Sequence, residues 1–198
     1  MKSSIQSEIK NQKSEIILAS QSPQRKEILK NLGIFFRAIP ADIDEHHDGL
    51  KTPFAIAKSI AQRKAEKIAK KHPDNWIIGC DTIVVLKNGK IVLKPKDRAE
   101  AKAILKAYSD SYCDVYSGLC LMSQKLNKKF VQHEKTRIHF RHISNSEIEA
   151  YLETGEWVGR SGALTIEERG DWVKKIEGDY WNIVGLPVNL LKEMLSAL

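Results

Sequence analysis

The chain has 198 residues, a formal net charge of +7 at pH 7 and 42% hydrophobic residues. This length suits one domain, built as a single body or as two lobes, and it is long enough for a hydrophobic core. Because no apolar run approaches roughly 18 residues, we expect no membrane span. The positive charge favours an anionic partner, either a phosphate-bearing small molecule or a nucleic acid.

The N-terminal residues 1–15 are polar, alternate in charge and contain no apolar stretch. They predict a frayed extension rather than a signal peptide, ahead of one domain over 16–198. The three cysteines, Cys80, Cys113 and Cys120, lack metal-ligand spacing, and their odd number fits the reduced thiols of a cytoplasmic protein.

The first predicted elements alternate between strand and helix. Residues 16–19 form a short apolar run, which predicts a buried strand, and a second strand is predicted over 34–39. Between them, Ser22 followed by proline is a capping signal for a helix that reaches about residue 32. A threonine followed by proline opens a second helix, predicted over 53–71.

The middle of the chain is rich in strand signals. Residues 76–86 and 90–93 predict two strands joined at Asn88-Gly89, a pair typical of a type I′ hairpin turn. The next segment, 97–108, begins with a capping-box pattern and predicts a helix.

The rest of the chain continues this alternation. Residues 112–122 and 130–140 predict a long antiparallel pair of strands, followed by a helix from Ser144 to about Thr154. The last forty residues predict three short strands and a terminal helix, near 163–166, 172–176, 181–184 and from Pro187. Together the elements predict an α/β fold with a mixed sheet rather than a regular βαβ array.

The most informative residue is Asp81, which lies in the middle of the predicted 76–86 strand. A buried carboxylate is costly without a partner, so it indicates either an ion pair with a neighbouring arginine or a site that holds a metal or a water. The sequence of the strand alone leaves both interpretations open.

A candidate anion site lies where the first strand meets the first helix. Ser20, Ser22 and Arg25 lie there, beside the backbone N–H groups of a helix N-terminus. The alternative is ordinary capping by Ser22, which would leave Ser20 and Arg25 unexplained.

Other charged segments carry weaker signals. Lys94 is held extended by Pro95, and a lysine in such a position is usually just solvated. The acidic and histidine-rich segment 42–48 suggests either a metal site or an exposed loop. The lysines of 64–71 fit a solvated helix face better than a nucleic-acid patch, and no aromatic residues are interleaved with basic ones.

Seven motifs in series resemble the Maf family of nucleoside triphosphate pyrophosphatases over about residues 16–197. They are LASQSPQRKEIL at 18–29, Asp44-Glu45, QRKA at 62–65, GCDT at 79–82, Lys94-Pro95, SGA at 161–163 and NIVGLP at 182–187. The resemblance implies a mixed, strongly curved sheet with flanking helices and two lobes around a cleft, similar to the inosine triphosphatase fold. It also implies a divalent cation, Mg²⁺ or Mn²⁺, and a protein that is often a homodimer.

The resemblance also assigns roles to particular residues. The family's proposed catalytic base falls on Asp81, which would share a metal ion with Glu45. Its phosphate-binding groups fall on Ser20, Arg25, Lys64 and Lys94.

The positions that recognise the base imply less about the substrate. Family members that act on dTTP and UTP carry Arg, Thr and Gln at three base-recognising positions. At the corresponding positions this chain has Gln24, Thr82 and Glu167. One of three residues agrees, so a substrate like dTTP or UTP and one like 7-methyl-GTP both stay open.

The expected activity is hydrolysis of non-standard or modified nucleoside triphosphates to monophosphate and pyrophosphate. The alternative is a catalytically inactive regulator of cell division that binds a nucleotide or a nucleic acid. Asp81, Arg25 and Lys94 are all present, which favours the enzyme because a pure binder does not need all three.

Overall fold

The computed structural model describes residues 15–45 and 49–198. The predicted extension lies outside this range except for its last residue, as do His46, His47 and Asp48. The described chain forms two compact units: one contains residues up to 81, 117–134 and 185–198, and the other contains 82–116 and 135–184. None of the helices in the described part of the chain is long and apolar enough to cross a membrane.

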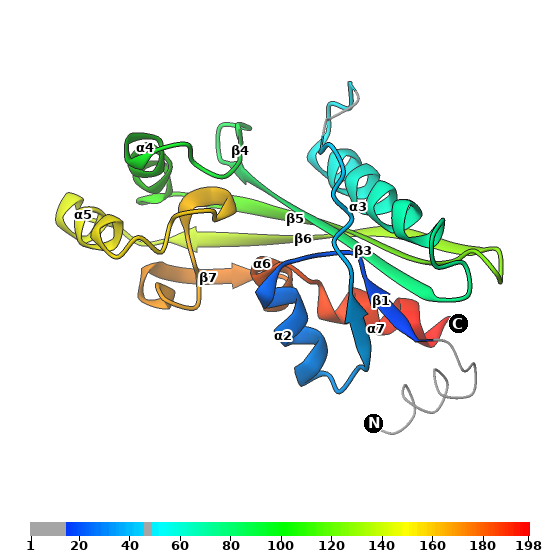
Figure 1. The fold of residues 1–198 in the computed structure, drawn as a ribbon. Coiled ribbons are helices and arrows are strands. Elements are labelled where there is room, and N and C mark those ends of the chain that lie inside the picture. The colour runs from blue at the N-terminus through cyan, green and yellow to red at the C-terminus, as the bar shows by residue number, and fades with distance from the viewer. Residues whose placement is uncertain (1–14, 46–48) are drawn as a thin grey trace. The chain divides into compact units, whose positions relative to one another are not determined.

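The helices and strands confirm a mixed α/β fold. Parallel pairs join β1 to β2 and to β3, whereas β4 pairs antiparallel with β3, and β7 pairs antiparallel with β6. The sheet has the strand order β2-β1-β3-β5-β6-β7, with β4 on β3. The elements are β1 Ile16–Leu18, α2 Pro23–Asn31, β2 Phe36–Ala38, α3 Pro53–Ala69, β3 Trp76–Leu86, β4 Ile91–Val92, α4 Arg98–Tyr108, β5 Tyr112–Ser123, β6 Lys128–Phe140, α5 Asn145–Glu153, β7 Val173–Glu177, α6 Tyr180–Val184 and α7 Val188–Ser196 (Figure 1).

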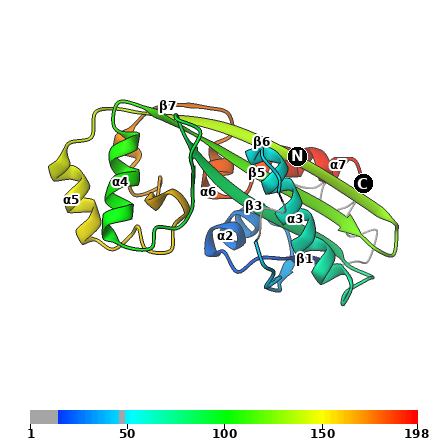
Figure 2. The same ribbon diagram turned by 90° about the horizontal axis from the view of Figure 1, so that it is seen from above.

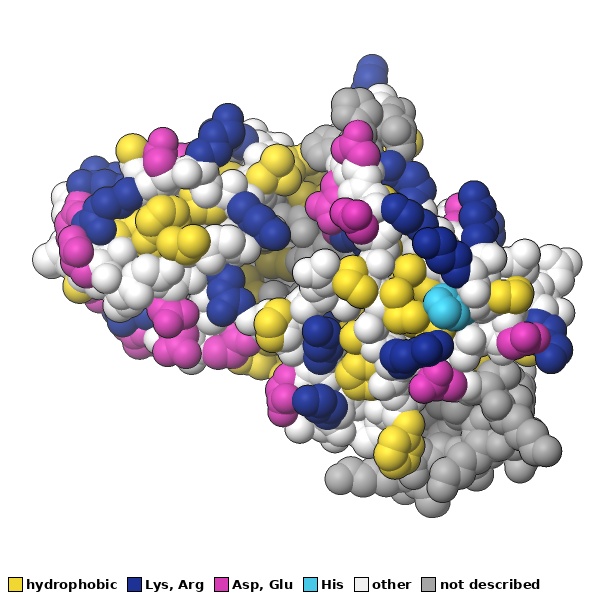
Figure 3. Space-filling model, viewed as in Figure 1, with side chains coloured by type: hydrophobic (Ala, Val, Ile, Leu, Met, Phe, Trp, Pro, Cys, Tyr) yellow, Lys and Arg dark blue, Asp and Glu magenta, His cyan; other side chains and the backbone are white. Residues whose placement is uncertain are grey.

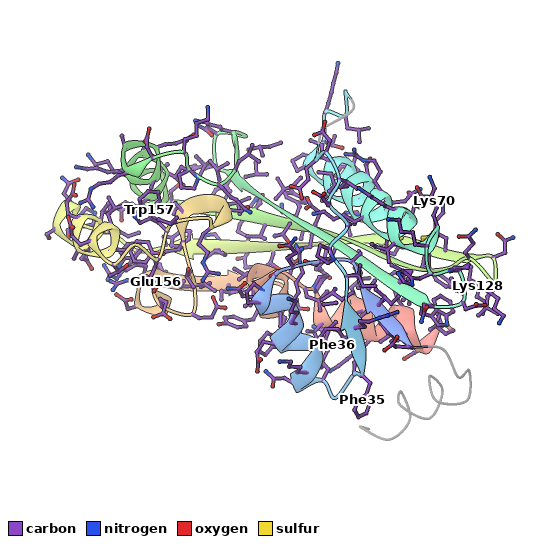
Figure 4. All side chains as sticks on the ribbon, in the orientation of Figure 1. Phe35, Phe36, Lys70, Lys128, Glu156 and Trp157 are labelled. Carbon is purple, nitrogen blue, oxygen red and sulfur yellow. The ribbon has the colours of Figure 1, made fainter. Side chains whose placement is uncertain are left out.

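The first unit is built on the parallel strands β1, β2 and the first half of β3. In the registers of these pairs, Ile16 lies opposite Phe36 on one side and Trp76 on the other. Its core combines apolar residues of the strands with the alanine-rich face of α3 and with Cys120 of β5. Phe35, just before β2, is by contrast largely exposed and points away from this core (Figure 4).

The two capping signals of this unit have different outcomes. The Ser22 hydroxyl accepts a hydrogen bond from the backbone N–H of Arg25, so the predicted cap of α2 is confirmed. Thr52 precedes α3 without a side-chain capping bond, and there Pro53 alone marks the start of the helix.

Two glycines allow α3 to approach the sheet closely. A Cβ added to Gly79 of β3 would lie 2.1 Å from the Ala61 carbonyl oxygen, and one added to Gly118 of β5 would lie 2.1 Å from the Ala57 carbonyl oxygen. Any side chain at either position would therefore push the helix away. The same face of β3 carries Asp81 two residues further along, so this packing also sets how far α3 lies from the carboxylate.

The second unit packs α4 and α5 side by side, as Figures 1 and 2 show. Arg98 of α4 donates to Glu149 and Glu153 of α5, each at 2.7 Å. Its core contains stacked Tyr108 and Phe140, with ring centroids 4.7 Å apart.

The capping boxes of this unit also differ. The full box of α5 forms between Ser144 and Glu147, whereas in α4 only half of the predicted box forms. The Glu100 side chain accepts from the N–H of Lys96 rather than from the N–H of Asp97.

The predicted hairpin between β3 and β4 exists, but its turn is not type I′. That turn needs positive φ at both central residues, and Gly89 has a φ of +83° whereas Asn88 is not among the described residues with positive φ. Gly89 N–H donates to Leu86 O, and Leu86 N–H donates to Lys90 O. These bonds describe a three-residue loop in which glycine provides the left-handed bulge.

Two short strands predicted near the C-terminus are wrong. Gly162, just before the segment 163–166, and Ala163, its first residue, have φ of +74° and +57°, and a chain that turns there cannot extend into a strand. The segment 181–184 belongs to α6 instead. The Asp179 carboxylate accepts from the N–H of Trp181, and buried Asn182 donates to the Val115 carbonyl, so tertiary contacts override the strand propensity of this run.

The close approach of α3 to β3 predicts a severe effect of Gly79→Ala. We expect the free energy of unfolding to fall by at least about 2 kcal/mol, because the new methyl group meets backbone rather than a flexible side chain. Urea unfolding followed by circular dichroism measures this. In the control Gly170→Ala, where no atom lies within 4 Å of the added carbon, the midpoint should barely move. Equal midpoints for the two variants would contradict the packing argument.

Candidate active site

Asp81 is a buried carboxylate on the face of β3 that packs against α3. The residue is 8% exposed, and its neighbour Cys80 points to the opposite face, where its thiol donates to the Gly185 carbonyl at 3.3 Å. The sequence-based prediction of a buried acid on a strand is thus confirmed, and so is the alternation of Asp81 and Cys80.

Lys64 of α3 joins two carboxylates. Its Nζ donates to Asp81 Oδ1 at 2.8 Å and forms an ion pair with Glu45 Oε1 at 2.7 Å. The side chains of Lys64 and Asp81 are nearly buried, whereas that of Glu45 is 60% exposed. The predicted ion pair of Asp81 therefore exists, but its direct partner is a lysine rather than an arginine.

The surroundings of Asp81 raise its pKa above the ordinary value. Burial is the largest cause, since it disfavours the charged form. Lys64 and Arg25 oppose burial by favouring the carboxylate, and Glu45 adds a further upward effect. Such a carboxylate holds a proton more readily than an exposed one, which suits a group that accepts a proton from water.

The N-terminus of α2 brings Ser20 and Arg25 together. Arg25 Nη1 donates to Ser20 Oγ at 3.2 Å, and Arg25 Nε donates to the Gly185 carbonyl at 2.8 Å. Ser22 caps the helix and also donates to Gln24 Oε1 at 3.3 Å. Capping by Ser22 and a cluster of Ser20 with Arg25 therefore coexist, and the first does not exclude an anion site.

The loop before α3 is fastened to the helix by its basic residues. Arg63 donates to the carbonyl of Asp44 at 2.8 Å, and Lys67 donates to the carbonyl of Asp42. These two bonds place Glu45 beside Lys64. Figure 3 shows Lys and Arg side chains gathered over α3, with Asp and Glu side chains beside them.

The acidic and histidine-rich segment is only partly described, since residues 46–48 lie outside the described range. Within the part that the structure describes, no cluster of three or more His, Cys, Asp and Glu residues is arranged to hold a metal ion. Since His46, His47 and Asp48 lie outside that part, the suggestion of a metal site in 42–48 stays a prediction.

Three predicted site residues belong to the second unit. Thr82 follows Asp81 on β3 and is half-buried, whereas Lys94 and Glu167 are exposed. Lys94 comes directly after Leu93, whose carbonyl accepts from the N–H of Gly162. Glu167 lies close enough to Tyr180 to raise the pKa of that phenol, although burial is the larger cause.

The role of Gly185 was not predicted from the sequence. Its carbonyl accepts from both Arg25 and Cys80, and it lies in the predicted NIVGLP motif. Its φ of +118° suits glycine. The glycine itself was the signal in the sequence that the backbone here has a special conformation.

Comparison with known proteins places the chain in a family. A sequence model described as "Maf-like protein" matches residues 15–198. The chain belongs to the Maf family.

Relatives in several bacteria carry a common name. A protein of Pelotomaculum thermopropionicum named "dTTP/UTP pyrophosphatase" is 42% identical over 92% of this chain and 95% of its own length. Proteins of the same name from Dictyoglomus thermophilum and Latilactobacillus sakei are 39% and 40% identical, over 94% and 91% of this chain. They match over 97% and 98% of their own lengths, so the similarity spans whole proteins.

Proposed function

We propose that the protein hydrolyses nucleoside triphosphates to nucleoside monophosphate and pyrophosphate, as a house-cleaning enzyme. The observation that carries this proposal is the buried carboxylate of Asp81, held by Lys64, on a chain of the Maf family. The names of the relatives support the same reaction.

Cleavage between the α and β phosphates needs neutralised negative charge and a water molecule in line with the leaving pyrophosphate. Arg25 and Ser20 lie at the N-terminus of α2, where the helix dipole and backbone N–H groups also favour an anion. In our proposal Arg25 binds phosphate oxygens in pairs, while Lys64 and Lys94 act as point charges. Asp81 accepts a proton from the attacking water or holds a cation.

Asp81 and Glu45 are the residues that we propose to hold a divalent cation, Mg²⁺ or Mn²⁺. The donor set fits, because both carboxylates lie within 2.8 Å of one positive charge, and hard cations prefer carboxylate oxygens. Two carboxylates also suffice, because Mg²⁺ is usually held by one or two of them together with phosphates and waters. When bound, the cation would neutralise phosphate charge and lower the pKa of a water molecule.

For the base, the relatives' names favour dTTP and UTP as substrates. Thr82 agrees with the set expected for these nucleotides, whereas Gln24 and Glu167 depart from it. An ionised Glu167 only accepts hydrogen bonds, so it suits a base that presents adjacent donors, such as guanine or 7-methylguanine. We therefore propose pyrimidine triphosphates as substrates, with Glu167 broadening the choice toward guanine-type bases.

Product analysis tests the proposed reaction directly. With Mg²⁺ or Mn²⁺, we expect the purified protein to convert a nucleoside triphosphate to monophosphate and pyrophosphate, and EDTA should abolish turnover. A coupled pyrophosphate assay over a panel of nucleotides, run with and without EDTA, measures the product formed and its dependence on the cation. Release of orthophosphate, or activity unaffected by EDTA, would reject the mechanism, and binding without turnover would favour the regulator.

Asp81→Asn keeps the shape of the side chain but removes its charge and basicity. We expect turnover to fall at least about 100-fold, as for the loss of one key electrostatic group. The control is Cys80→Ser on the opposite face of β3, where the thiol donates to the Gly185 carbonyl and a hydroxyl is likewise a donor. Steady-state kinetics measures the turnover of both variants. A larger loss of turnover in Cys80→Ser than in Asp81→Asn would contradict the proposed role of Asp81.

Glu167→Gln tests recognition of the base. Glutamine offers a donor and an acceptor, which matches the uracil or thymine edge, whereas a carboxylate facing a carbonyl leaves two acceptors opposed. We expect the ratio of kcat/KM for UTP and dTTP to that for GTP and 7-methyl-GTP to rise. The neighbouring change Glu168→Gln is the control, and an unchanged ratio in Glu167→Gln would mean that Glu167 does not reach the base.

A further inference from the structure

The ammonium group of Lys64 forms ion pairs with two carboxylates, one nearly buried and one mostly exposed. Lys64 Nζ lies 2.8 Å from Asp81 Oδ1, inside the unit, and 2.7 Å from Glu45 Oε1, at its surface. The Lys64 side chain is only 12% exposed, so little water screens this group. The ammonium thus lies at the point where the two carboxylates converge.

The arrangement is held from several sides. Gly79 and Gly118 bring the backbone of α3 close to β3 and β5, which lets Lys64 reach Asp81. Arg63 and Lys67 fasten the loop that carries Glu45 to the same helix. The backbone beside both carboxylates is thus held against α3 by contacts that do not involve the Lys64 ammonium.

A lysine ammonium and a divalent cation are alternatives at such a position. Both bind carboxylate oxygens, but two positive charges a few ångströms apart in a weakly screened site repel each other strongly. Lys64 therefore cannot keep both of its short contacts while a cation binds the same two carboxylates. Its flexible four-carbon stem, by contrast, allows the ammonium to move to a nearby anion.

We propose that Lys64 takes the place of the divalent cation in the nucleotide-free protein and is displaced from Asp81 and Glu45 when the cation binds. The displaced ammonium then pairs with the phosphates of the substrate, a step that rests on the proposed function. Lys64 is in this way a stand-in cation that keeps two carboxylates ordered and paired before the substrate arrives.

Displacement makes the two ligands cooperate. A cation that binds alone must break two ion pairs of Lys64 without giving the ammonium a new partner. When a triphosphate is present, its phosphates supply that partner, so each ligand strengthens the binding of the other by the same factor. The protein would consequently bind a free cation weakly and the cation with a triphosphate more tightly.

Binding of Mn²⁺ alone to the nucleotide-free protein tests the stand-in role. In Lys64→Met the competing charge is gone, so we expect the dissociation constant of Mn²⁺, from the electron paramagnetic resonance of free Mn²⁺, to fall about tenfold or more. Lys64→Arg keeps the charge and should show no such gain. The control Lys71→Met, an exposed lysine just beyond α3, removes the same net charge away from the carboxylates. Unchanged or weaker binding in a folded Lys64→Met protein would overturn the proposal.

The wild-type protein offers a second test that does not depend on how a variant folds. An ammonium held by two carboxylates reacts slowly with an amine-modifying reagent, and its release exposes it. We expect saturating Mn²⁺ to raise the rate of Lys64 modification several-fold, measured by mass spectrometry, while the rate at Lys71 stays constant. A Lys64 rate that does not respond to bound Mn²⁺ would overturn the proposal.

These outcomes separate the inference from the proposed function. Tighter Mn²⁺ binding in Lys64→Met together with no release of pyrophosphate by the wild type would reject the enzyme and keep the stand-in role. Release of pyrophosphate by the wild type without any gain in Mn²⁺ binding in Lys64→Met would keep the enzyme and reject the stand-in role.

Discussion

The pairing of Asp81 with Lys64 is the interaction on which the rest of the site depends. Burial raises the pKa of the Asp81 carboxyl, and the positive charge of Lys64 opposes that rise. That charge comes from α3, so the helix must approach the sheet closely. Gly79 and Gly118, which face the Ala61 and Ala57 carbonyls, are therefore as much a condition of the chemistry as the charged residues.

The basic character of the chain also has a structural use. Several lysines and arginines that composition alone assigns to an anionic partner bind the protein itself. Arg63 and Lys67 hold a loop through its carbonyls, and Arg25 holds the Gly185 carbonyl. A net positive charge is thus a weak indicator of a large polyanionic partner, since part of it serves to position the site.

Local patterns predicted the parts of the fold that depend on neighbouring residues. The bounds of β3, the cap at Ser22 and the start of a helix at Ser144 follow from short-range rules and are confirmed. The errors lie where distant contacts decide. Asn182 is held by residues far away in sequence, so its segment is helical despite a strand-like composition. The bridging of Glu45 and Asp81 by Lys64 likewise joins three separate segments, and no spacing along the chain reveals it.

The bond between Arg25 and Gly185 connects residues 160 positions apart. During synthesis, the N-terminal helix leaves the ribosome long before the carbonyl that holds its arginine has been made. A growing chain therefore contains Ser20, Arg25 and Lys64 without the contact that fixes the guanidinium. The first unit takes its last segment from residues 185–198, so it is completed only after these residues have been made. Before that segment is made, the Arg25 guanidinium has its bond to Ser20 but lacks the bond to Gly185, so the position of this arginine is fixed late in synthesis.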